Sequence, residues 1–203
     1  ALLLAAGYAP VWRHSALGEA EMAMVDRALD FMLRQHEPFP AFVIDRRWNL
    51  LRANVGGQRF AGFLMGQPSL TPDPDEPINL ADALLAPEPM RPLFANWPEV
   101  VSYFLRGVHT DALIDGTEET RALFDRLLTY PDVRSVLEST PTDREPEPVL
   151  AMDIAKGDTR IRLFTTLATL GTPLDVTAQE IRVECFFPAD AASAEVFERW
   201  TVA

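Results

Sequence analysis

The sequence predicts an α+β domain in which a five-stranded antiparallel sheet has helices packed on one face. Segments near both ends of the chain alternate apolar and polar residues, as strands with one covered face do. The middle of the chain repeats apolar residues at the helical spacing of three and four. At 203 residues, the chain is long enough to bury a core of its own without disulfides or a metal.

The first block of the chain predicts a helix, a hairpin and a second helix. Residues 21–36 form an amphipathic pattern that ends at a Pro-Phe-Pro sequence. Two short apolar segments, 41–44 and 48–53, flank the turn-forming residues 45–47 and predict a β-hairpin. Asn54 follows directly and is a favourable N-cap for the next helix.

The second block is predicted to be a helical insertion covering about residues 78–138. Proline-rich stretches at 66–77 and 139–148 border it, and proline excludes regular structure there. Asn79 and Thr117 each precede an apolar pattern of helical period, so both are expected to cap helices.

The third block predicts three strands and a closing helix. Apolar residues alternate with polar ones through 150–154, 161–167 and 181–187. Residues 191–200 then return to a helical pattern. Together with the hairpin, these strands give the five that the predicted sheet requires.

Composition restricts the partners of the chain. Its net charge is −12 and Lys156 is its one lysine, so it lacks the clustered basic residues that contact phosphates. We therefore expect any DNA contact to come from a segment that this sequence does not include. Cys185 is the single cysteine, which fits a reducing cytoplasm, and no apolar run is long enough to span a membrane.

No catalytic or metal-binding pattern is present in the sequence. His14, His36 and His109 lack the spacing of metal ligands, and Cys185 lies in an alternating strand, where a small apolar group is the simpler interpretation. We therefore predict a protein that is not an enzyme and has no cofactor or metal. The weaker rival is an enzyme whose acid/base pair comes together only in the fold.

Large apolar residues from all three blocks are the most informative feature. Ordinary core packing explains most of them, but short, proline-broken helices over a sheet favour a cavity for an apolar molecule. Threonine hydroxyls of Thr165, Thr166 and Thr169, and the charges of Arg52, Arg106 and Arg162, are candidates for polar contacts. The predicted ligand-binding residues are Phe42, Ile44, Trp48, Phe60, Phe63, Leu84, Leu85, Phe94, Trp97, Val101, Phe104, Leu105, Phe164 and Thr166.

Three stretches resemble a known family. Residues 40–54, 164–177 and 184–190 are similar to the MmyB-like ligand-binding domain of Xre-type helix-turn-helix regulators, and residues 2–10 resemble the junction after the DNA-binding helices. The resemblance implies a PAS-like fold, a preceding helix-turn-helix and a fatty-acid-like lipid as ligand. It also implies a linker over residues 1–20, followed by the ligand-binding domain over 21–203.

Two functional hypotheses follow. The first is a cytoplasmic, homodimeric sensor domain of a bacterial transcription regulator, in which an apolar or fatty-acid-like small molecule modulates DNA binding by the helix-turn-helix. The alternative is a dimerisation or protein-interaction module that binds no small molecule, because its own side chains fill the cavity. Fold analogy alone does not decide between them.

Overall fold

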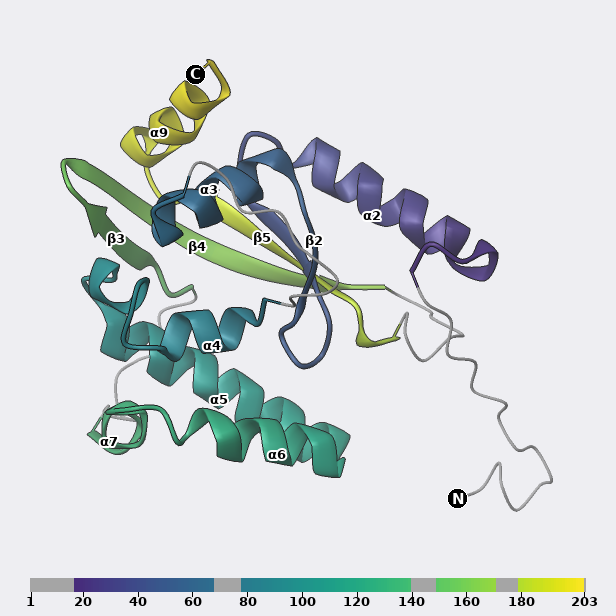
Figure 1. Cartoon of the computed structure of the whole chain (residues 1–203), viewed down its shortest axis with the longest axis vertical. Coiled ribbons are helices and arrows are strands. Elements are labelled where there is room, and N and C mark those ends of the chain that lie inside the picture. Colours follow the sequence, from purple (N-terminus) through teal and green to yellow (C-terminus); the bar gives the residue numbers. More distant parts are fainter. Residues whose placement is uncertain (1–16, 68–77, 140–148, 171–178, 203) are drawn as a thin grey trace.

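A computed structural model describes residues 17–67, 78–139, 149–170 and 179–202 (Figure 1). The elements are η1 (Ala20–Met22), α2 (Ala23–Gln35), β1 (Ala41–Ile44), β2 (Leu50–Ala53), α3 (Val55–Met65), α4 (Leu80–Leu85), η2 (Arg91–Leu93), α5 (Trp97–Asp115), α6 (Glu118–Leu127), α7 (Val133–Ser139), β3 (Met152–Lys156), β4 (Thr159–Thr169), β5 (Arg182–Pro188) and α9 (Ala191–Val202).

The predicted five-stranded antiparallel sheet is confirmed. Its strand order is β2-β1-β5-β4-β3, so β5, from the C-terminal part of the chain, is the central strand. Each neighbouring pair is antiparallel. Glu184 at the middle of β5 lies opposite Phe42 on β1 and Leu167 on β4. With its helices, the sheet makes an α+β fold consistent with a PAS-like domain.

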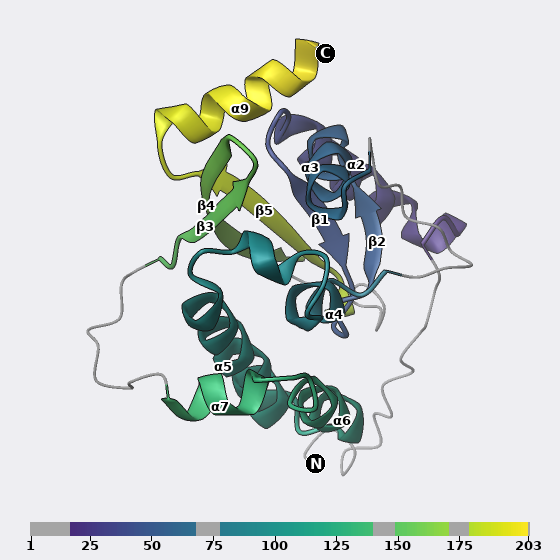
Figure 2. The ribbon, with the colours of Figure 1, turned by 60° about the vertical axis from the view of Figure 1, so that its left-hand side comes forward.

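The sheet separates two apolar layers. The inner face carries Phe42 and Leu163 and packs in the larger core cluster, which also contains residues of α3, α4, α5 and α9. The outer face carries Val43 and Val183, which form a smaller cluster with Leu29 and other residues of α2. Helix α2 therefore lies on the face opposite α3, α4, α5 and α9, and the central strand lies between two apolar layers (Figures 1 and 2).

The helices between β2 and β3 form a block at one side of the sheet. Helices α5, α6 and α7 lie together, far from α9, which packs at the other end of the sheet (Figure 2). Helix α4 and the short η2 connect this block to the strands, and Phe94 forms an isolated bridge with Ile154 of β3. This block occupies the segment predicted to be a helical insertion.

The three predicted N-caps are confirmed. The side chains of Asn54, Asn79 and Thr117 accept a hydrogen bond from the backbone amide three residues later, at 2.7, 3.0 and 3.3 Å, respectively. Each satisfies one of the amides that a helix leaves without an internal partner. Local sequence therefore sets the start of α3, α4 and α6.

The second strand of the hairpin differs from its prediction. It begins at Leu50 rather than at position 48, because Trp48 adopts a positive φ of 69° in the turn. An irregularity then shifts the register of β2 against β1, as a β-bulge does. As a result, Arg52 pairs with Asp26 and Asp30 of α2 and links β2 to the outer helix.

Some predictions concern residues outside the described part of the chain. These are most of the linker at 1–20, most of the proline-rich stretches at 66–77 and 139–148, and the end of the family-like stretch at 164–177. Within the described ranges, none of the helices combines the length and the apolar character needed to cross a membrane.

Candidate ligand-binding site

Most of the predicted ligand-binding residues meet in the inner layer. Buried members of the larger core cluster are Phe42, Ile44, Phe60, Leu85, Phe94, Trp97, Val101 and Leu105. Half-buried residues packed against that cluster are Trp48, Phe63, Leu84 and Phe104.

Aromatic contacts connect the strands and the hairpin turn with the helices in this layer. Phe186 of β5 lies with its ring centroid 5.5 Å from that of Phe42 and 5.7 Å from that of Phe60. At the other side, Trp48 and Phe104 of α5 are 4.8 Å apart between centroids. Such pairs contribute about 0.5–1.5 kcal/mol beyond the area they bury. All but two of the predicted ligand-binding residues thus form one packed group.

Phe164 and Thr166 lie on the other face of the sheet. Phe164 is paired with Phe187 and stacks on its ring, with 5.4 Å between centroids, and Phe187 contacts His36 at the end of α2. Thr166 is opposite Cys185, which belongs to the outer layer, and is exposed. The prediction that these two residues line the same layer as Phe42 is therefore wrong, because alternate residues of β4 point to opposite faces.

The inner face of the two central strands is not fully covered. Thr165 and Leu167 of β4, and Glu184 and Phe186 of β5, are all on this face. Thr165, Glu184 and Phe186 are half-buried, and Leu167 is 44% exposed. We call these four residues the central strip. Solvent reaches the strip although helices of the same core cluster cover the rest of the face.

Glu184 is the polar residue at the middle of the strip. Burial raises the pKa of its carboxyl from 4.5 to about 7, and a hydrogen bond with the Thr165 hydroxyl opposes this shift. A carboxyl held in an apolar environment with a perturbed pKa is a common feature of functional sites. The sequence analysis did not select Glu184, although its place between Val183 and Cys185 marks it as facing away from them.

An ion pair joins the sheet to α5 beside the strip. Arg182, two residues before Glu184 on the same face of β5, donates to Asp111 of α5 at 2.5 Å. The Arg182 side chain is largely buried. Along β5, the inner face thus changes from a charged pair at Arg182, through Glu184, to the aromatic group around Phe186.

The three arginines that the sequence suggested as candidates for polar contacts with the ligand are engaged elsewhere. Arg52 pairs with α2 on the outer side, and Arg162 pairs with Asp153 at 3.2 Å across β3 and β4. Arg106 is exposed and donates to Ser102 within α5 at 3.0 Å. None of the three extends into the inner layer, so the basic residue nearest to the strip on β5 is Arg182.

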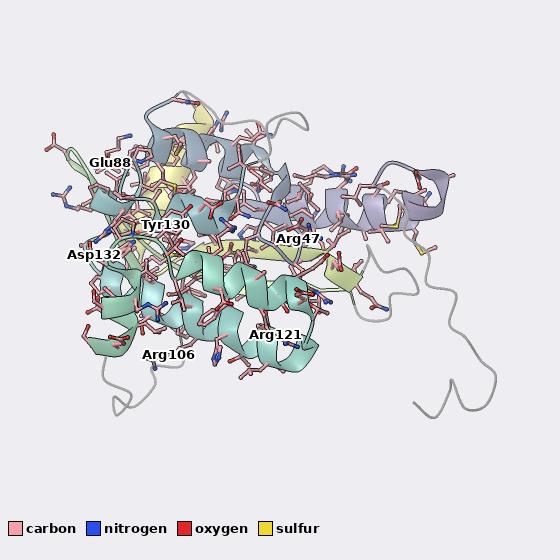
Figure 3. All side chains as sticks on the ribbon, turned by 60° about the horizontal axis from the view of Figure 1, so that its bottom comes forward. Arg47, Glu88, Arg106, Arg121, Tyr130 and Asp132 are labelled. Atoms are coloured by element: carbon pink, nitrogen blue, oxygen red, sulfur yellow. The ribbon has the colours of Figure 1, made fainter. Side chains whose placement is uncertain are left out.

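Three pockets on the described surface lie away from the predicted ligand-binding residues. One of about 300 Å³ is lined by Arg47, Asn79 and Arg126, among others, where Arg47 pairs with Glu119 at the N-terminal end of α6 (Figure 3). A second, of about 220 Å³, lies between β3, β4 and the start of α9. None of the predicted ligand-binding side chains lines these two pockets or the third, which lies between α5 and α6.

Groups suited to metal binding or nucleophilic catalysis are not assembled in the described ranges. No cluster of three or more His, Cys, Asp or Glu side chains is found there. Burial, followed by the charge of Glu184, raises the pKa of the Cys185 thiol, which lowers the fraction of reactive thiolate at neutral pH. The contacts of Cys185 are those of a small apolar side chain in the outer layer.

The fold and the inner layer define a PAS-like α+β domain with an apolar interior between sheet and helices. The family model of the MmyB-like transcription regulator ligand binding domain matches residues 25–199, and the chain belongs to this family. The resemblance seen in the sequence is thereby confirmed. A comparison with curated proteins found no significant match.

Proposed function

We propose that this domain binds an apolar or fatty-acid-like small molecule in the inner layer and thereby modulates DNA binding by a helix-turn-helix segment of the same regulator. Membership of a family of regulator ligand-binding domains gives the class of function. The ligand chemistry, a homodimeric state and a place in the bacterial cytoplasm are parts of the proposal. DNA contact is assigned to the helix-turn-helix because the chain carries a net charge of −12.

The observation that carries this proposal is the central strip. Leu167 and Phe186 are apolar side chains on the covered face of the two middle strands, yet both stay accessible. An alkyl chain lying along them toward Phe42 and Phe60 would gain about 0.8 kcal/mol for each methylene it buries. About twelve methylenes offer a gross ~10 kcal/mol, from which ordering of the ligand takes a substantial part. Micromolar affinity, about −8 kcal/mol, is the expected range.

The test begins with protein purified under mild conditions. Native mass spectrometry should detect a bound species that is released on denaturation and that carries a long apolar chain. After delipidation, straight-chain compounds of increasing length should raise the melting temperature progressively until the layer is full, since a ligand that binds only the folded state stabilises it. An absence of any bound species, together with a flat chain-length series, would refute the ligand hypothesis.

The alternative, an interaction module without a small-molecule ligand, has an observation in its favour. Helix α5 exposes Leu113 and Ile114, at 69% and 80%, and Leu113 lines a pocket of about 410 Å³ together with Phe124. Exposed apolar patches of this kind are typical of protein contacts. Because the proposed sensor is homodimeric as well, sedimentation analysis of the wild-type chain and of a Leu113→Glu, Ile114→Lys double variant separates the two functions only together with the ligand-binding test above, in which the interaction module binds nothing. The interaction module requires association that the double variant loses.

A further inference from the structure

We infer that Glu184 is the polar anchor of the inner layer, and that it selects amphiphiles whose head group donates hydrogen bonds, an ammonium above all, over those with a carboxylate. This inference rests on the proposed function, because it concerns the head group of the same ligand. It differs from the fatty-acid expectation in the chemistry it assigns to that group.

The position of Glu184 is the first part of the argument. It lies on the central strand, opposite Phe42 on one side and Leu167 on the other, with Phe186 next on the same face. A carboxyl among such neighbours is costly unless a partner compensates its charge. Because Glu184 also stays partly accessible, a molecule that lies on the central strip contacts this carboxyl directly.

The surrounding charges leave Glu184 uncompensated. Arg182 lies on the same face of the same strand, but its guanidinium is bound to Asp111 of α5. From β4, Thr165 supplies a neutral hydroxyl. No ion pair involving Glu184 is found in the described part of the chain. The group formed by Arg182, Asp111 and Glu184 therefore contains one cation and two acidic side chains.

An ammonium and a carboxylate head group would interact with Glu184 in different ways. An ammonium placed at Glu184 forms a charge-assisted hydrogen bond and compensates the buried carboxylate. A carboxylate placed there adds a like charge at short range, so that one of the two groups must take up a proton. It avoids this only by sharing the Arg182 guanidinium with Asp111, which places two carboxylates on one cation beside Glu184. A hydroxyl, which donates without charge, should be intermediate.

The central strip also sets a direction for the apolar tail of the proposed ligand. From Glu184, β5 continues to Phe186, which contacts Phe42 of β1 and Phe60 of α3. The strip therefore runs from a polar end beside the Arg182–Asp111 pair to an aromatic end. An amphiphile with its head at Glu184 places its chain along these rings, where burial is favourable.

The experiment compares three probes of equal chain length: dodecylamine, dodecan-1-ol and dodecanoate. Each is titrated into the delipidated chain by calorimetry at pH 8 and physiological salt, the amine and the acid below their micelle concentrations and the alcohol below its solubility limit. Wild-type protein should bind the amine at least tenfold more tightly than the acid, with the alcohol between them. Glu184→Gln retains shape and hydrogen bonding but loses the charge, and it should remove this preference. Glu195→Gln, on the exposed surface of α9, is the matched control and should retain it.

The outcomes separate this inference from the proposed function. If wild-type protein binds dodecanoate as well as dodecylamine, or if the preference for the amine survives in Glu184→Gln, the assignment of Glu184 is wrong while an apolar ligand site remains. If none of the three probes binds, the proposed function fails along with it. Equal loss of the preference in Glu195→Gln would show that overall negative charge, and not Glu184, attracts the amine.

Discussion

Asn54 provides the sharpest test of how this fold is held together. Its side-chain oxygen accepts hydrogen bonds from the amides of Ala41 and Gly57, at 2.9 and 2.7 Å. Its nitrogen donates to the carbonyls of Leu33 and Phe39, at 3.2 and 2.8 Å. One buried amide thus joins α2, β1 and α3. Replacing it by aspartate preserves the shape but exchanges the donor nitrogen for an acceptor oxygen.

The expected loss follows from those contacts. In Asn54→Asp, the carbonyls of Leu33 and Phe39 each lose a donor and face a negative oxygen. A buried polar group without its partner costs about 1–3 kcal/mol. Two of them cost roughly 2–6 kcal/mol, and a carboxylate near the N-terminus of α3 recovers about 0.3–1 kcal/mol. A net loss of about 2–5 kcal/mol is a large share of the ~5–15 kcal/mol that stabilises a domain.

Urea unfolding followed by circular dichroism measures this loss. Asn79→Asp is the matched control, because Asn79 also caps a helix and its nitrogen also donates twice, to the Arg47 carbonyl and to the Asn49 side chain, but at a less buried site. Aspartate is as good an N-cap as asparagine, so the control should lose less than about 1 kcal/mol. Equal losses in the two variants, or no loss in Asn54→Asp, would refute the role assigned to the amide nitrogen.

Two further predictions concern a close contact and a buried carboxyl. A Cβ at Gly56 would lie 2.3 Å from the Pro38 carbonyl oxygen, so Gly56→Ala should lower the melting temperature markedly. At Gly107 a Cβ meets nothing within 4 Å, so Gly107→Ala should raise the melting temperature, because alanine stabilises a helix by ~0.5–1 kcal/mol relative to glycine. Similar shifts in both variants would contradict this explanation. Because the folded-state pKa of Glu184 is about 7 against an ordinary 4.5, the folded state retains a proton that the unfolded state releases between these values. Wild-type stability should therefore fall as pH rises through this range, by up to about 3 kcal/mol relative to Glu184→Gln. If the free energies of unfolding of the two proteins, measured in urea, change with pH in the same way across that range, the carboxyl is not desolvated.

Local signals explain which parts of the fold could be predicted. Asn54, Asn79 and Thr117 each cap a helix through a side chain that bonds to its own backbone neighbourhood, so the sequence next to each is sufficient. The strands were predictable because their apolar residues alternate with polar ones.

The hairpin shows where local signals fail. The positive φ of Trp48 is unfavourable for a bulky residue, and nothing in its side chain predicts it. In this conformation, Trp48 contacts residues that are distant in the sequence. The Trp48 carbonyl accepts from the Leu80 amide at 2.9 Å, and its ring packs against Phe104. The bulge that follows redirects Arg52 to α2, an outcome that alternation along one strand cannot give.

The sheet faces were the main obstacle to finding the candidate site. Alternation in β5 was interpreted as one covered face, formed by Val183 and Cys185, with Glu184 turned toward solvent. Helix α2 does cover Val183, but helices of the larger core cluster cover the opposite face, to which Glu184 belongs. When both faces of a strand are buried, a charged residue at an alternating position lies inside the protein. Its charge then requires a partner, which is why Glu184, a carboxyl that the pattern assigned to solvent, became the proposed anchor of a ligand.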